Sequence, residues 1–148
     1  KKIIFLLLVT GVTATINYAQ YNIGDTQLNA SLLKIDDGAK LNFSAFKTDI
    51  SLSYNVSERK IDSWSVQFGM KAGEIYLALE IAKITKKPIE DVIKVYQANK
   101  TKGWGYIAKQ LGIKPGSHEF HALKNSTSSR AEKSKGGKTS GKGKPKSK

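Results

Sequence analysis

The chain of 148 residues contains no cysteine. This absence excludes disulfide bonds, thiolate chemistry and zinc sites built on cysteine. The stability of the protein therefore has to come from an ordinary hydrophobic core, and the length is sufficient for one domain or for two very small ones.

Long apolar runs are also lacking, because no stretch approaches the ~20 apolar residues that a membrane span requires. The longest run, Ile3 to Val9, follows two lysines and precedes small residues. This order is typical of a signal peptide, and the alternative is a buried N-terminal helix. We expect residues 1–19 to be removed after Ala19, or a shorter segment after Ala14. The mature protein is then periplasmic or extracellular.

Histidine is scarce, since only His118 and His121 occur, beside a basic C-terminal segment. Ser–His–Asp catalysis requires a buried, oriented histidine, and a metal site requires a third ligand that the neighbouring sequence does not supply. We therefore interpret both histidines as surface residues. The acidic pair Glu90 and Asp91 is explained by a helix N-terminus, which favours negative charge. We predict a protein that is not an enzyme, without catalytic residue, metal or cofactor.

Acidic residues are outnumbered, and the formal net charge is +13. Of this charge, +7 lies between Asn125 and Lys148, where eight basic residues accompany one acid. Gly, Ser and Lys dominate this segment, which cannot bury enough apolar surface to offset the loss of conformational entropy. We predict a disordered tail over residues 125–148. Such a lysine-rich tail either attracts polyanions or only keeps the chain soluble.

Apolar residues at helical spacing predict an all-α domain over residues 45–124, with about six short helices. Ser57 and Gly69 suit the start and the end of the second helix, and Pro88 suits the start of the fourth. Ser117 suits the cap of the last helix. The fifth helix is expected from Trp104 to Leu111. The inward-facing residues expected on the first, second, third, fourth and sixth helices are, in that order, Phe46, Ile50 and Tyr54; Ile61, Trp64 and Phe68; Ile75, Leu79 and Ala82; Ile89, Val92, Ile93 and Tyr96; and Phe120 and Leu123.

Residues 20–44 carry mixed signals. The leucines from Leu28 onward favour a helix, whereas Asp36-Asp37-Gly38 favours a turn, as in a hairpin. We interpret the segment as an irregular N-terminal arm that packs three apolar side chains on the core: Leu32, Leu41 and Phe43.

The second half of the domain resembles the first when the sequence is shifted by 43 positions. Residues 67–73 then fall on residues 110–116, where two glycines and a lysine coincide. Chance similarity between two amphipathic regions is the alternative. A true repeat predicts two tandem units of three helices that share one core, because three short helices bury little alone. Trp64 and Trp104 are expected in that core.

Ala108 and Gly112 show the Ala-x-x-x-Gly spacing of a helix-turn-helix. In that turn a small residue lets the helices approach, and glycine accepts a left-handed bend. Residues 88–125 thereby resemble a helix-turn-helix unit of the homeodomain-like kind. The insertion of Pro115-Gly116-Ser117 departs from that pattern, and the last helix offers few side chains suited to base edges.

A longer motif, Gly-Trp-Gly-x-Ile-Ala-Lys-x-Leu-Gly-Ile-Lys-Pro-Gly-Ser-x-x-Phe-His-Ala-Leu-Lys, begins at Gly103. It is similar to the motif of a group of small secreted bacterial proteins with Lys/Gly-rich tails. The resemblance covers nearly the whole mature chain. It implies a common fold and export, and it implies no activity.

Two functions remain open from the sequence. The first is an exported, non-catalytic module that binds polyanions such as extracellular nucleic acid without sequence preference. The second is a protein–protein or structural component of the cell envelope. For the first function, the expected contact residues are Lys109, Lys114, His118, His121, Lys124, Lys133, Lys135, Lys138, Lys142 and Lys144.

Overall fold

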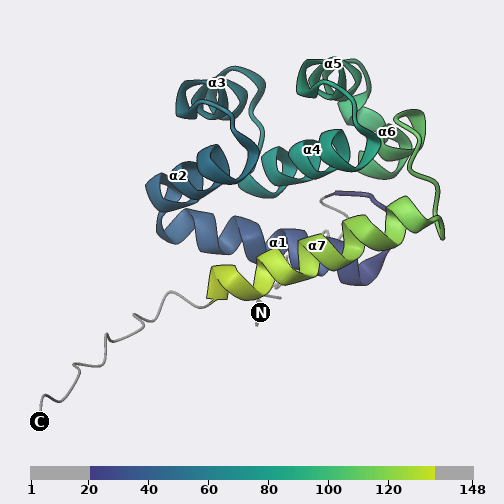
Figure 1. The fold of residues 1–148 in the computed structure, drawn as a ribbon, viewed down its shortest axis with the longest axis horizontal. Helices are drawn as coiled ribbons and strands as arrows, with labels where there is room; N and C mark the ends of the chain where they lie inside the picture. The colour runs from purple at the N-terminus through teal and green to yellow at the C-terminus, as the bar shows by residue number, and fades with distance from the viewer. Residues whose placement is uncertain (1–20, 136–148) are drawn as a thin grey trace, which may run out of the picture.

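The computed structural model describes residues 21–135, whose only regular secondary structure is helical, with no strand among them (Figure 1). The predicted all-α class is confirmed. The predicted signal peptide and residues 136–148 of the tail lie outside the described residues. The elements follow in the order α1 (Thr26–Leu41), α2 (Phe43–Tyr54), α3 (Glu58–Phe68), α4 (Ala72–Thr85), α5 (Ile89–Asn99), the 3-10 turn η1 (Lys100–Lys102), α6 (Trp104–Gln110) and α7 (His118–Lys135).

The helices are arranged in layers around α4. In Figure 1, α1 and α7 lie side by side, α2 and α4 cover them, and α3 and α5 lie on the opposite side of α4. Ten of the 14 residues of α4 are buried. A helix covered on most sides has to be apolar around most of its circumference, which explains the nearly continuous apolar sequence of this segment.

The N-terminal arm that we expected to be irregular is instead a regular helix, α1. Asp25 caps it, because the carboxylate accepts a hydrogen bond from the backbone N–H of Leu28 at 2.7 Å. Leu28, Leu32 and Ile35 recur at helical spacing and are fully buried. The Asp-Asp-Gly sequence forms no turn, because Asp36 faces the interior and finds hydrogen-bond donors there.

Two of the three core contacts expected from this segment are confirmed. Leu32 is buried, and Phe43 packs against the core from the start of α2. The expectation for Leu41 is wrong, because its side chain is 89% exposed. Leu41 ends α1 two residues beyond the buried Ala39, and two residues in a helix point to nearly opposite sides.

The helices between residues 43 and 112 lie close to their predicted bounds. Ser57 caps α3, and Gly69 ends it with a φ of 67°. Pro88 is the cap of α5 rather than its first helical residue. Trp64 and Trp104 are buried in the core, as expected. Residues 21–135 contain seven α-helices: α2 to α7 correspond to the about six predicted, and α1 is the additional one. The tandem repeat stays a prediction.

The last helix, α7, continues past Asn125 to Lys135, so the prediction of disorder for residues 125–135 is wrong. Leu123, Thr127 and Ala131 are spaced by one helical turn and are all buried. The hydroxyl of Thr127 donates to the carbonyl of Leu123 at 2.7 Å, so this polar group is satisfied. Small side chains let α7 lie close to its neighbours, and a composition poor in large apolar residues gave no sign of this packing.

Candidate anion-binding surface and cleft

The residues predicted to contact polyanions do not form one compact patch. Lys109 on α6, Lys114 in the following loop, and His118 and His121 on α7 are exposed near one end of the molecule. Lys133 is exposed near the other end of α7, about 22 Å along the helix axis from His118 at 1.5 Å per residue. Of the remaining predicted residues, Lys135 is the last residue of α7. The others, Lys138, Lys142 and Lys144, lie outside the described residues.

Lys124 is engaged within the fold. Its Nζ donates to Oδ2 of Asp25 at 2.9 Å, and its side chain is 26% exposed. Burial raises the pKa of Asp25, but hydrogen bonds from the Leu28 N–H and from Lys124 outweigh this effect and bring the pKa below its usual value. Lys124 therefore joins α7 to the N-terminus of α1 and is not free to hold a ligand.

The outward face of α7 is nearly neutral. It presents His118 and His121, followed by Asn125 and Ser129, all exposed. Within residues 21–135, no third potential metal ligand joins the two histidines. The opposite face of α7 packs on α1 and α4. The helix-turn-helix resemblance stays a prediction, and the exposed face offers a nucleic acid few positive charges.

Positive charge in the folded part is concentrated in one segment, of which the sequence interpretation had singled out only Lys109 and Lys114. Residues 86–117 contain seven lysines and two acids, a formal charge of +5, whereas residues 21–85 contain seven basic and eight acidic residues. Lys94 pairs with Asp91 at 3.7 Å. The other lysines of this segment form no salt bridge with a described residue: Lys86, Lys87, Lys100, Lys102, Lys109 and Lys114. We call these six residues the lysine cluster. The sequence signal for the lysine cluster is the local excess of lysines over acidic residues, which appears when charge is counted segment by segment.

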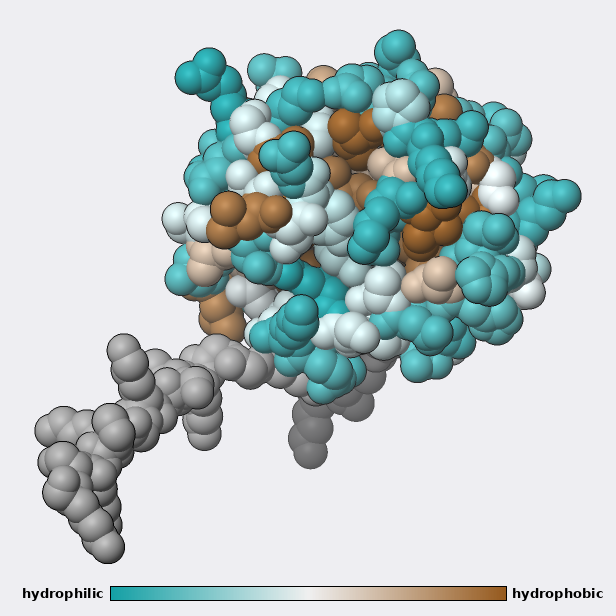
Figure 2. Space-filling view, viewed as in Figure 1, coloured by the Kyte–Doolittle hydropathy of each residue, from teal (hydrophilic) through white to brown (hydrophobic). Residues whose placement is uncertain are grey.

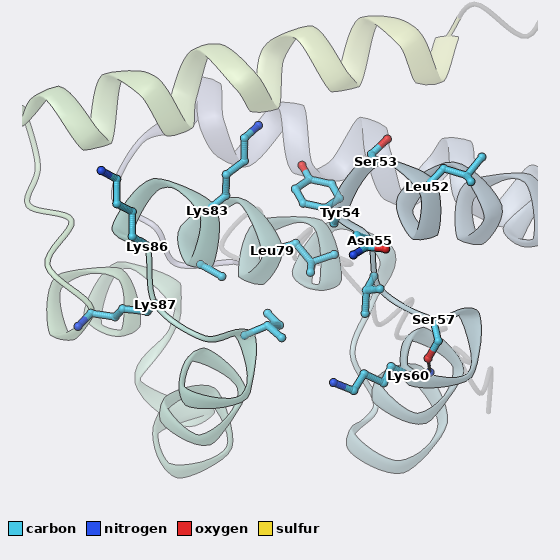
Figure 3. A pocket seen from close by; sticks show the side chains of 13 residues that line it. Leu52, Ser53, Tyr54, Asn55, Ser57, Lys60, Leu79, Lys83, Lys86 and Lys87 are labelled. Atoms are coloured by element: carbon cyan, nitrogen blue, oxygen red, sulfur yellow. Dashed lines mark hydrogen bonds between the residues drawn. The ribbon is translucent and has the colours of Figure 1, made fainter.

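A cleft of about 690 Å³ opens beside the first two lysines of this cluster, at the C-terminal ends of α2 and α4 (Figure 3). Its apolar lining consists of Leu52, Val56, Leu79, Ala82 and Ile89. Its basic lining consists of Lys60, Lys83, Lys86 and Lys87. Figure 2 shows hydrophobic residues exposed in the hollow between α3 and α5, with hydrophilic residues around them.

The four lysines of the cleft differ in their partners. Lys60 on α3 donates to Glu90 on α5 at 2.5 Å, which lowers the pKa of Glu90 below its usual value. Lys83 lies 3.4 Å from Glu80, one turn earlier on α4. Lys86 and Lys87, in the loop after α4, pair with no described carboxylate. Figure 3 shows these two at the α4 side of the cleft with their amines pointing away from Leu79, whereas the Lys60 amine points into the gap from α3.

One wall of the cleft is fixed by a half-buried tyrosine that pairs with a buried carboxylate. The hydroxyl of Tyr54 donates to Oε1 of Glu80 at 2.5 Å, and Glu80 is 3% exposed. Burial raises the pKa of Tyr54, and the hydrogen bond to Glu80 raises it further. The phenol therefore stays protonated and holds α2 to α4. Figure 3 shows this hydroxyl pointing toward α7 and away from Leu79.

A second buried pair joins the chain before α1 to α1 and α4. Asp36 accepts hydrogen bonds from the Tyr21 hydroxyl at 2.5 Å and from the Gly73 N–H at 2.8 Å. Burial raises the pKa of Tyr21, and the charge of Asp36 raises it further. Gly73 has to lack a side chain, because a Cβ there would meet the Tyr21 hydroxyl and lie 2.9 Å from the Leu32 carbonyl. The sequence carried no signal for this contact.

Comparison of the chain with protein-family models, with curated proteins and with solved structures gives no match. Among the described residues, no helix combines the length and the apolar character needed to cross a bilayer. The lysine cluster and the cleft are the two features of the described residues that suggest a function.

Proposed function

We propose that the protein is an exported, non-catalytic binding module that holds polyanions, such as nucleic acid or an acidic polysaccharide, by their charge. The observation that carries this proposal is the lysine cluster: six lysines without a described acidic partner between residues 86 and 117. The basic segment at residues 136–148 adds a second source of positive charge. The signal-peptide pattern of residues 1–19 supports export.

The binding is expected to be independent of nucleic-acid sequence. Lysine contacts phosphate or sulfate groups as a point charge, and such contacts position a ligand without reading base edges. Each phosphate that is neutralised releases condensed counterions, so the affinity falls steeply as salt rises. The neutral outward face of α7 supports a charge-based interaction rather than insertion of this helix in a groove.

The test is a salt titration of binding to duplex DNA and to heparin. The chain from Gln20 to Lys148 is compared with a chain ending at Lys135, which keeps α7 intact. We expect the plot of log K against log salt to lose about 0.9 of slope for each phosphate contact removed. The double variant Lys109→Glu/Lys114→Glu in the shortened chain should reduce the slope and the affinity further.

The matched control is Lys34→Glu/Lys40→Glu, which changes the net charge equally but lies on α1, where both lysines are near acidic residues. An equal loss in this control means that only overall charge matters and removes the role of the lysine cluster. Absence of binding by the full chain at about 150 mM salt contradicts the proposal as a whole.

A second candidate function is a protein–protein or structural role in the cell envelope. Three large apolar side chains outside the core favour it, since Leu41, Leu52 and Val66 are 89%, 80% and 82% exposed. Single exposed apolar residues are common on soluble proteins, so this observation ranks second. Two results together favour this alternative: the protein does not bind heparin, and it still binds a protein partner after residues 136–148 are removed.

A further inference from the structure

We infer that the cleft at the C-terminal ends of α2 and α4 docks a short acidic peptide segment of a partner protein, anchored by an aliphatic side chain. This inference concerns a protein ligand and shares Lys86 and Lys87 with the lysine cluster of the proposed function, from which the apolar floor distinguishes it. It rests on three features that coincide in the cleft: an apolar floor, two lysines without a described acidic partner, and polar groups along the rim.

The apolar floor calls for an apolar group in the ligand. Leu79 and Ala82 of α4 form the floor together with Ile89 at the start of α5. Leu52, at the edge, is 80% exposed, and its burial under a ligand would remove apolar surface from water. The volume of about 690 Å³ is within the range of about 300–1,000 Å³ typical of ligand clefts. It accommodates a few residues of a peptide.

The charges around the floor select an acidic ligand. No Asp or Glu lines the cleft, whereas four lysines do. Lys60 and Lys83 have acidic partners within the fold, so the cations left for a ligand are Lys86 and Lys87 at the rim, whose exposed, flexible side chains have to turn toward the ligand from the outward direction seen in Figure 3. A peptide that carries carboxylates beside its anchor complements them, and a basic peptide is repelled.

The shape and the rim favour a peptide over two other anions. A nucleic acid or a sulfated polysaccharide has no aliphatic group to place on Leu79 and Ala82. A single fatty-acid chain is better served by an enclosed apolar tunnel, whereas this cleft is open to solvent (Figure 2). Its rim carries the hydroxyl of Ser57 and the amide of Asn55, which suit the polar backbone of a peptide, whereas the Ser53 hydroxyl points away from Leu79 (Figure 3).

The test uses a fluorescent twelve-residue peptide built from Asp, Glu, Ser and Leu, with binding followed by fluorescence polarisation. Two control peptides replace either every Leu by Ser or every acid by its amide. Each control is expected to bind at least about tenfold more weakly, because a tenfold change needs only 1.4 kcal/mol. Equal binding of all three peptides, or no binding at concentrations up to about 1 mM, which corresponds to the weakest specific affinities, overturns the inference.

Protein variants then locate the site. Lys86→Glu/Lys87→Glu is expected to weaken peptide binding at least about tenfold, and Lys86→Gln/Lys87→Gln, which adds no repulsion, about threefold. The matched pair Lys109→Glu/Lys114→Glu should change it less than about twofold. Heparin binding, by contrast, should fall with both charge-reversed pairs. Equal loss of peptide binding in the two pairs overturns the assignment to the cleft.

The apolar anchor is tested with two similarly exposed residues. Leu52→Ser at the cleft should weaken the peptide about threefold or more, whereas Val66→Ser, at 82% exposure on α3, should leave it unchanged. If Leu52→Ser binds the peptide as tightly as the wild type does, the apolar contact does not contribute to binding, and the inference is overturned. Sodium dodecanoate serves as the amphiphile arm. The cleft is assigned to a fatty acid if dodecanoate binds saturably, if the Leu52 and Lys87 variants weaken that binding, and if the peptide does not bind. That result overturns the peptide ligand.

Discussion

Asp36 and Asp37 are adjacent and chemically identical, but the fold treats them differently. Asp36 is 4% exposed and accepts hydrogen bonds from Tyr21 and Gly73, whereas the side chain of Asp37 is 72% exposed and pairs with Lys40 one turn along α1. Asp36→Ala leaves two buried donors without their acceptor, at about 1–3 kcal/mol each. We expect the free energy of unfolding to fall by about 3–5 kcal/mol. Asp37→Ala removes an exposed pair worth about 0.5 kcal/mol.

Urea unfolding followed by far-ultraviolet circular dichroism measures both changes. The expected loss for Asp36→Ala is a large part of the 5–15 kcal/mol by which domains are usually stable, and at about 4 °C per kcal/mol it lowers Tm by roughly 12–20 °C. Tyr21→Phe removes one of the two hydrogen bonds and should give a smaller loss. The reasoning is refuted if Asp36→Ala and Asp37→Ala differ by less than about 1 kcal/mol.

Three other predictions concern the packing of the terminal helices. Gly73→Ala should lower the free energy of unfolding by more than about 2 kcal/mol, because its Cβ would meet Tyr21 and the backbone of Leu32. Gly69→Ala is the control in the same urea experiment. It is strained only by its positive φ and should lower the free energy of unfolding by about 1 kcal/mol. Asp25→Ala should lower it by about 1 kcal/mol near neutral pH through loss of the helix cap. The pKa of Asp25 is lowered in the folded protein, so its contribution is present above the unfolded pKa and is lost as the pH falls through the folded pKa. Wild type and variant should therefore converge in acid, and a constant difference would contradict this pairing. A chain ending at Asn125 should melt well below one ending at Lys135 in calorimetry, because it lacks the buried part of α7 that follows; equal melting temperatures would mean that this part adds no stability.

The middle of the fold could be read from the sequence because its signals are local. Ser57 and Gly69 mark the two ends of α3 by side-chain capping and by tolerance of positive φ, which depend only on neighbouring residues. Apolar spacing gave the buried faces of α4 and α5 for the same reason. The start of α7 at Ser117 was predicted, but α1 and the part of α7 beyond Asn125 were missed because their evidence is tertiary. Asp36 looks like a turn residue until Tyr21 and Gly73 are placed beside it.

The candidate site shows the same division. The positive charge could be counted from the sequence, but the basic tail drew attention away from the lysine cluster at residues 86–117. Lys124 was expected to face a ligand, and its pairing with Asp25 joins positions that are 99 residues apart. The cleft could not be predicted at all, because Leu52 and Lys87 come from different helix ends that meet only through the packing of α2 against α4.

The parallel pairing of the first and last helices also sets when this protein can fold. The hydroxyls of Ser31 on α1 and Ser128 on α7 lie 3.5 Å apart although they are separated by 97 residues of chain. During synthesis, α2 and α4 emerge early enough to cover part of α1, but the side of α1 that packs on α7 stays exposed until α7 has left the ribosome. Contacts of such long sequence separation also slow folding once the chain is complete. The native pairing of α1 with α7 can therefore form only at the end of translation, and the complete fold cannot precede it.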